Sequence, residues 1–190
     1  MMKQRCARWL LTVLGWKIEG IPPSERRFVL IAAPHTSNWD FPLMLLYAAA
    51  FGLQIKWLAK DSLFWPPLGW FMHFMGGIPV ERHHKKHLVN AMQETFNATD
   101  ELVLAVPAEG TRAVAQFWKS GFYHIAQGAR VPIVPSYLDY GHKRGGFGPP
   151  LTPTGDLSGD MDVFRAFYAP MEGKFPELFG PIRLREEDSP

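Results

Sequence analysis

A histidine and an aspartate five positions apart, His35 and Asp40, are a pair that could carry out acid–base chemistry. They lie in the segment APHTSNWDFP, directly after an apolar run that is typical of a buried strand. Histidine is the usual general base for a hydroxyl group, and a carboxylate on its far ring nitrogen would fix the tautomer. Chance can also produce this spacing, so a purely structural role for both residues stays open.

A second polar group, EGTR at residues 109–112, follows another strand-like run, ELVLAVP. Gly110 lets the backbone approach a ligand or adopt a positive φ, and Arg112 offers a planar fork that suits a phosphate. Thr111 supplies a hydroxyl, and Glu109 could accept from the turn's amides or orient the arginine. Ligands bind at the carboxyl ends of strands in open α/β sheets, so the combination suits acyl transfer to a hydroxyl on a phosphate-bearing molecule. The alternative is a surface turn with an incidental salt bridge.

A further cation, Arg82, follows the strand-like stretch GGIPV and could add positive charge at the same sheet edge. It could equally be an ordinary solvated arginine. His83 and His87 have the i, i+4 spacing of zinc-binding helices, but no glutamate occupies the HExxH position. Lys85 and Lys86 disfavour a divalent cation between them, so we expect a solvated basic face and no metal site.

Composition excludes several other classes of protein. The length of 190 residues fits one domain, and a hydrophobic fraction of 47% is sufficient for a core. Cys6 is the single cysteine, so no internal disulfide can form. The net charge of +2 is too small to indicate nucleic-acid binding. No GxSxG, Walker or GxGxxG motif occurs.

The elements that would position these residues alternate between strands and helices. We expect helices at residues 3–15, 39–51, 68–75, 86–96, 120–127 and 161–171, and strands at 16–19, 28–32, 54–58, 78–80, 102–106 and 131–138. Thr36, Ser37 and Asn38 are expected to cap the second helix. Residues 141–150 should form a loop or hairpin. The pattern predicts one α/β domain, with a mainly parallel mixed sheet flanked by helices and an N-terminal amphipathic helix.

The N-terminal helix, residues 1–16, combines basic residues with an apolar stripe but lacks a signal-peptide cleavage site. We expect an interfacial helix that contacts a membrane surface, with packing on the domain's own core as the alternative. Residues 17–180 would form the main domain and residues 181–190 a disordered tail. The aromatic segment 64–75 could line an apolar tunnel, touch a membrane interface or belong to the core. No apolar stretch is long enough to span a bilayer.

The order of the motifs resembles that of the glycerolipid acyltransferase family, which includes the lysophosphatidic acid acyltransferases. The matching residues are His35-x4-Asp40, then GGIPVER, EGTR and VPIVP, with FWKSG between the last two. The resemblance covers about residues 28 to 140. Two positions depart from the pattern of many members. Pro34 stands where they have an asparagine before the motif histidine, and Ala108 stands where they have a proline before the motif glutamate.

The resemblance implies a role for each residue of the motifs. His35 would deprotonate the acceptor hydroxyl, and Asp40 would orient its ring. Glu109, Gly110, Thr111 and Arg112 would bind the acceptor, with Arg112 on its phosphate and Arg82 sharing the charge. The acyl donor would be acyl-CoA or acyl-carrier protein, and the acceptor a lysophospholipid or glycerol phosphate. No metal or redox cofactor is implied.

The expected activity is therefore an O-acyltransfer at the cytoplasmic face of a membrane, by a peripheral or monotopic protein. Two other activities stay open. The same base could activate water and hydrolyse an acyl thioester, or the chain could be a non-catalytic lipid-binding module. A binding module would not need a paired His35 and Asp40.

Overall fold

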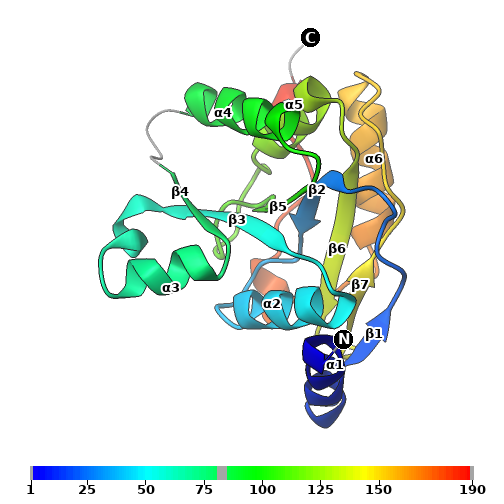
Figure 1. Cartoon of the computed structure of the whole chain (residues 1–190). Coiled ribbons are helices and arrows are strands. Elements are labelled where there is room, and N and C mark those ends of the chain that lie inside the picture. Colours follow the sequence, from blue (N-terminus) through cyan, green and yellow to red (C-terminus); the bar gives the residue numbers. More distant parts are fainter. Residues whose placement is uncertain (1, 81–84, 189–190) are drawn as a thin grey trace.

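In the part of the chain that the structure describes, seven strands form a single sheet that helices cover on both faces (Figure 1). The computed structural model describes residues 2–80 and 85–188. The helices are α1 (Met2–Val13), α2 (Asp40–Phe51), α3 (Leu68–Phe74), α4 (Lys85–Ala98), α5 (Gly121–Ala129) and α6 (Leu157–Tyr168), with 3-10 helices η1 (Asp61–Phe64), η2 (Pro176–Leu178) and η3 (Arg185–Asp188). The strands are β1 (Lys17–Glu19), β2 (Arg27–Ala32), β3 (Ile55–Lys60), β4 (Gly77–Val80), β5 (Leu102–Pro107), β6 (Ile133–Asp139) and β7 (Arg144–Phe147). The predicted class, an α/β domain with a mainly parallel mixed sheet, is confirmed.

The strand order is β1-β7-β6-β2-β5-β3-β4. Five neighbouring strands, from β6 to β4, run parallel, and β7 turns back to pair antiparallel with β6. The segment expected to be a loop or hairpin is therefore a hairpin. Strands β2 and β5 are adjacent, and Ala32 pairs with Pro107 at their carboxyl ends. The segments that follow these two strands must start side by side.

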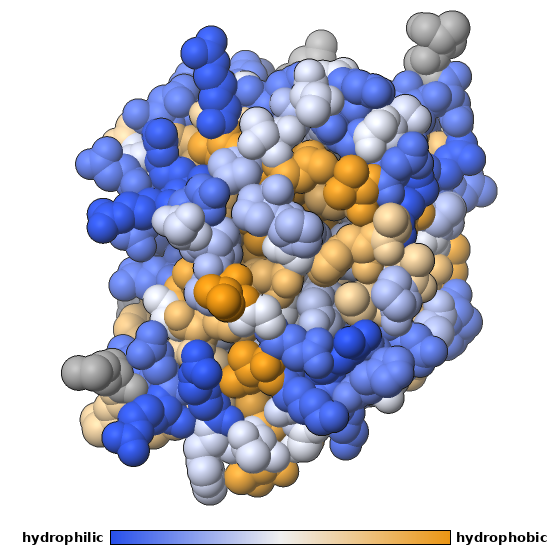
Figure 2. Space-filling view, turned by 90° about the vertical axis from the view of Figure 1, so that its right-hand side faces the viewer, coloured by the Kyte–Doolittle hydropathy of each residue, from blue (hydrophilic) through white to orange (hydrophobic). Residues whose placement is uncertain are grey.

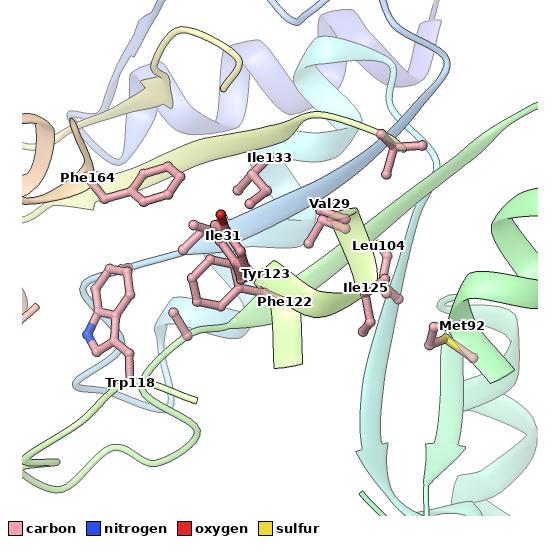
Figure 3. Close-up of a cluster of buried hydrophobic side chains, with 14 of the residues drawn as sticks. Val29, Ile31, Met92, Leu104, Trp118, Phe122, Tyr123, Ile125, Ile133 and Phe164 are labelled. Atoms are coloured by element: carbon pink, nitrogen blue, oxygen red, sulfur yellow. The ribbon is translucent and has the colours of Figure 1, made fainter. Parts of the chain in front are cut away.

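After Arg27, central strand β2 is apolar, because helices cover both of its faces. Its residues Val29 and Ile31 point to one face, where they meet α5 (Figure 3). Phe122, Tyr123 and Ile125 of α5 are all within 2% of complete burial in this cluster. Helices α4 and α6 complete the cover of this face, in the upper part of Figure 1. This layer of buried side chains holds the helices firmly against one face of the sheet.

The opposite face of the sheet is covered by α2 and, beside it, by η1 and α3. Phe28, Leu30 and Val103 pack here against Ala48 of α2 and Phe64 of η1. Helix α2 ends as the sequence indicates, with Gly52 at φ 78° closing the last turn. Its start differs from the expectation. Ser37 accepts from the Trp39 amide within the preceding turn, and no side chain caps the first turn of the helix.

Helix α1 packs on the outer side of α2 through one face. Ala7 and Leu11 are buried there, and the guanidinium of Arg8 donates to the Ala50 carbonyl at 3.0 Å. Large apolar side chains stay exposed away from this contact, namely Trp9, Leu10 and Val13 of α1 and Leu14 just after it. Figure 2 shows hydrophobic atoms at the lower end of the molecule, where α1 lies. Among the described helices, none is long and apolar enough to cross a bilayer.

Residues 181–188 are ordered, in contrast to the expected disordered tail. Leu184 is completely buried, and the Trp118 amide donates to the Arg183 carbonyl at 2.8 Å. Arg165 of α6 bonds Glu187 at 2.8 Å. The buried Leu184 and the ion pair between Arg165 and Glu187 attach this segment to the domain. Its acidic composition gave no indication of either contact.

Candidate active site

His35 and Asp40 are brought together at the carboxyl end of β2. His35 lies in the turn after the strand, and Asp40 is the first residue of α2. The His35 Nδ1 atom is 3.2 Å from Asp40 Oδ2, and the two side chains are 17% and 6% exposed. The same Asp40 oxygen accepts from the Ser37 amide at 2.8 Å. Asp40 therefore closes the turn and also faces the ring nitrogen, which leaves Nε2 of His35 for a ligand.

Tyr140 is a third member of this group that the sequence did not reveal. Its hydroxyl donates to Asp40 Oδ1 at 2.8 Å, from the chain just beyond β6. Burial, followed by this hydrogen bond, raises the pKa of Tyr140 above its ordinary value, so the tyrosine stays protonated. Trp16 packs edge-on against its ring with centroids 5.0 Å apart. One hundred residues separate Tyr140 from Asp40, and no local pattern marks the contact.

Glu109 lies beneath the histidine rather than in contact with solvent. It is completely buried, and its Oε1 atom accepts from the His35 backbone amide at 2.6 Å. Burial raises the pKa of Glu109 to about 7, partly offset by that hydrogen bond. Its Oε2 atom has no hydrogen-bond partner among the described residues. The side chain therefore ties the turn after β5 to the turn after β2, and its binding of the acceptor stays a prediction.

The remaining residues of the EGTR turn border the same open space as His35. Gly110 adopts φ 69°, and a Cβ at this position would lie 2.9 Å from the Lys119 side chain, so the turn requires glycine. Thr111 accepts from the Ala113 amide at 3.2 Å. Arg112 is exposed and has no ion pair or hydrogen bond to any described residue. An unengaged guanidinium suits recognition of an anion.

A cavity of about 540 Å³ extends from these residues between α2 and the sheet. Its polar end is bordered by His35, Asp40, Gly110, Thr111 and Arg112. The rest is lined mainly by apolar side chains: Leu30, Phe41, Met44, Ala48, Phe51, Leu53, Ile55, Trp57, Leu63, Met72 and Phe147. A polar mouth on an apolar interior suits a ligand with a hydrocarbon chain and a polar head.

Two expectations fall on residues 81–84, which lie outside the described residues: the contribution of Arg82 and the pairing of His83 with His87. Among the residues that are described, no three His, Cys, Asp or Glu side chains gather so that they could hold a metal ion. The aromatic segment 64–75 belongs to the core only in part. Phe64 and Met72 pack inward, whereas Trp65, Trp70 and Phe74 are exposed.

A solved structure of another protein shares this fold. The structure resembles a crystal structure of the 1-acyl-sn-glycerophosphate (LPA) acyltransferase PlsC from Thermotoga maritima, with a TM-score of 0.60. The match covers 90% of this chain and 77% of that one at 16% identity, so it concerns the fold.

Two curated relatives are similar in sequence. An uncharacterised acyltransferase from Schizosaccharomyces pombe is 28% identical over 127 residues, 62% of this chain and 44% of that protein. A 1-acyl-sn-glycerol-3-phosphate acyltransferase from Saccharomyces cerevisiae is 26% identical over 152 residues, 70% of this chain and 49% of that protein. The chain thus spans about half the length of the curated relatives that it matches. The family model described as Acyltransferase matches residues 17–139, which include both strand-end motifs and most of the cavity, and the chain belongs to this acyltransferase family.

Proposed function

We propose that the chain transfers a fatty acyl group from a thioester donor to the hydroxyl of a lysophospholipid or of glycerol phosphate. The donor would be acyl-CoA or acyl-carrier protein. The observation that carries the proposal is the His35–Asp40 pair at the polar end of an apolar cavity, with the unengaged Arg112 beside it. The name of the Saccharomyces cerevisiae relative supports a phosphate-bearing acceptor.

In this proposal His35 is the general base. Asp40 holds the proton on Nδ1, so Nε2 can take the proton of the acceptor hydroxyl as its oxygen attacks the thioester carbonyl. A carbon–oxygen bond forms and the carbon–sulfur bond breaks. The proton then passes from His35 to the departing thiolate, and an ester and a free thiol are the products. No redox or metal cofactor is needed for this balance.

The cavity would hold the hydrocarbon chain of the donor or acceptor. Its volume of about 540 Å³ is within the range of pockets that bind small organic molecules, about 300–1,000 Å³. Burial of a methylene group contributes roughly 0.8 kcal/mol, so a long acyl chain would gain several kcal/mol here. Arg112 at the mouth would pair with the acceptor phosphate through two parallel hydrogen bonds.

Helix α1 would hold the protein at the membrane surface that contains its lipid substrates. Its exposed Trp9 and Val13 could enter the apolar edge of the headgroup layer, while Lys3 and Arg5 face anionic lipids. Its inner face stays on α2, so attachment does not require α1 to leave the domain.

Product analysis tests the proposal. Purified protein is incubated with liposomes, a labelled long-chain acyl-CoA or acyl-carrier protein, and a panel of acceptors, with His35→Ala as the control. The panel includes lysophosphatidate, glycerol phosphate and monoacylglycerol, which lacks the phosphate. We expect label in a phosphate-bearing ester and little label on monoacylglycerol. Free fatty acid as the main product with either donor would replace transfer by hydrolysis, and no product with either would contradict both.

A further inference from the structure

The segment formed by η1, α3 and the residues between them, 61–74, exposes an unusual number of large apolar side chains. Trp65, Trp70 and Phe74 are 75%, 73% and 84% exposed. Leu63, Leu68 and Phe71 are exposed as well. An exposed apolar patch of this kind on a domain marks an interaction surface more often than it marks ordinary surface.

These exposed side chains do not belong to the core of the domain. The inner side of the segment is already packed, since Phe64 and Met72 rest on the sheet. Gly69 is buried, and a Cβ there would lie only 1.8 Å from the Phe64 carbonyl oxygen, so α3 sits tightly on η1. With its inner face occupied, the segment presents Trp65, Trp70 and Phe74 outward as a fixed surface.

Most of the exposed large apolar side chains lie on one layer of the molecule. Helices α1, α2 and α3 lie on the cavity side of the sheet, in the lower part of Figure 1. In α4, α5 and α6, which cover the other face, Val163 is the only large hydrophobic residue that is exposed among the described side chains. The patch on 61–74 is therefore part of a one-sided distribution and not of general surface hydrophobicity.

The segment also borders the cavity, and strand β3, which leads into it, carries exposed positive charge. Leu63 and Met72 contribute to the cavity wall, so the outer surface of this wall carries the aromatic side chains. Lys56 and Lys60 are exposed on β3, which leads into the segment, and Asp61 is the one acidic residue between residues 54 and 80. Aromatic rings with neighbouring lysines match the headgroup layer of an anionic bilayer, where tryptophan is enriched and basic residues are attracted.

We propose that residues 61–74 form a second membrane-docking element, separate from α1, which inserts Trp65, Trp70 and Phe74 into the surface of an anionic bilayer. Docking would place the outside of the cavity wall against lipid. The proposal of a docking surface is supported by the exposed aromatic side chains and by the neighbouring lysines of β3. Its purpose, the passage of lipid substrates into the cavity, rests on the proposed function.

Insertion is measured with the full chain and a fluorophore at the tip of the segment. In a Cys6→Ser background, Phe74→Cys is labelled with an environment-sensitive dye, and Val163→Cys carries the same dye as the matched control. Vesicles contain phosphatidylcholine with phosphatidylglycerol, or phosphatidylcholine alone. We expect a blue shift at position 74 with the anionic vesicles, a weaker one with neutral vesicles, and none at position 163. Vesicle binding without a shift at position 74 would overturn the proposal.

A second measurement uses the exposed side chains themselves. The triple variant Trp65→Ala, Trp70→Ala, Phe74→Ala should bind anionic vesicles at least about 10-fold more weakly, because transfer of each large apolar side chain out of water is favourable. The control Ile21→Ala, Val163→Ala, which also removes exposed apolar groups, should bind as the parent does. Equal binding by the triple variant would contradict the proposal. The proposal would also be contradicted if the parent protein self-associates without vesicles while the triple variant is monomeric, because the patch would then be a contact between copies of the chain.

These readouts separate the proposal from the proposed function. Insertion at position 74 in a protein that acylates no acceptor would support the docking surface and reject the activity. Acylation of lipid acceptors with no insertion at position 74 would do the reverse.

Discussion

Asp40 receives polar contacts from three parts of the chain, and each contact has a different origin. The Ser37 amide is local, the His35 ring comes from the end of β2, and the Tyr140 hydroxyl comes from beyond β6. The first two could be predicted from spacing. The third depends on how β6 pairs with β2, so the amino-acid sequence around either residue carries no sign of it.

Removing the Tyr140 hydroxyl tests its role as a positioning residue. We expect Tyr140→Phe to lower kcat roughly 10-fold, since hydrogen bonds to charged groups contribute about 1.5–3 kcal/mol. Asp40 would then attract a proton on His35 more strongly, so the acidic limb of the pH profile of kcat/KM should move to higher pH. The matched control is Tyr123→Phe, which removes the same kind of bond, to Asp160. An unchanged pH profile in Tyr140→Phe would show that Tyr140 contributes only packing and does not act on His35 through Asp40.

Glu109 makes the stability of the fold depend on pH. Its pKa is raised to about 7 in the folded protein because the side chain is buried, whereas the unfolded chain has the ordinary value of 4.5. The protonated form is therefore favoured by folding, and its stabilisation is complete below pH 4.5 and is lost as the pH rises through about 7. Its position behind the site could not be predicted, because burial is set by tertiary packing.

The variant Glu109→Gln cannot ionise but keeps an oxygen for the His35 amide. We expect its free energy of unfolding to change little between pH 5 and pH 8, while that of the parent falls by a few kcal/mol or less. Denaturant unfolding at the two pH values measures the difference, with Glu177→Gln at an exposed position as the control. Parallel pH dependence in parent and Glu109→Gln would contradict the buried-carboxyl account.

At the scale of elements, one face of α2 forms a wall of the cavity. Phe41, Met44, Ala48 and Phe51 recur at helical spacing, and all four line it. The apolar helix could be predicted from its composition. The cavity could not, because α2 is apolar on nearly all sides and its sequence does not distinguish the face toward the sheet from the face toward α1.

Ala48 is the small residue of this wall and lies about 12 Å along the helix from Asp40, at 1.5 Å per residue. We expect Ala48→Phe to shorten the cavity, so that kcat/KM for long-chain acyl donors falls at least about 10-fold while short-chain donors are used as before. The exposed Ala98→Phe on α4 is the control. Competition between labelled donors of different chain length provides the measurement. An unaltered chain-length preference in Ala48→Phe would show that the acyl chain of the donor does not bind in this cavity.

At the scale of the whole molecule, the ends of the chain join the domain at opposite places. Residues 181–188 close over α6 and the segment around Trp118 through Leu184, and α1 closes over α2 through Leu11. The alternation of strands and helices was enough to predict the class of fold. The placement of both ends was harder to predict. The C-terminal segment has a single buried leucine and no periodic signal, and the apolar stripe of α1 does not show whether it packs on the domain or on a membrane.

Leu184→Ala tests whether the C-terminal segment stabilises the domain. We expect the free energy of unfolding to fall by about 2–5 kcal/mol, as for other completely buried leucines. Ile21→Ala, at a side chain that is 87% exposed, should change it by less than about 0.5 kcal/mol. Denaturant titration measures both variants. A change at Leu184 no larger than that at Ile21 would show that the segment is not packed in solution.

The proposed role of His35 as the base is tested most directly by separating turnover from donor binding. In His35→Gln we expect kcat to fall about 10²- to 10⁴-fold, the usual contribution of a general base. The Kd of the acyl donor should stay within about twofold of the parent value, because only the transition state uses the base. Single-turnover kinetics and calorimetric titration of the same preparations give the two quantities. Full turnover in His35→Gln, or a loss of donor binding that accounts for the whole decrease, would contradict the assignment.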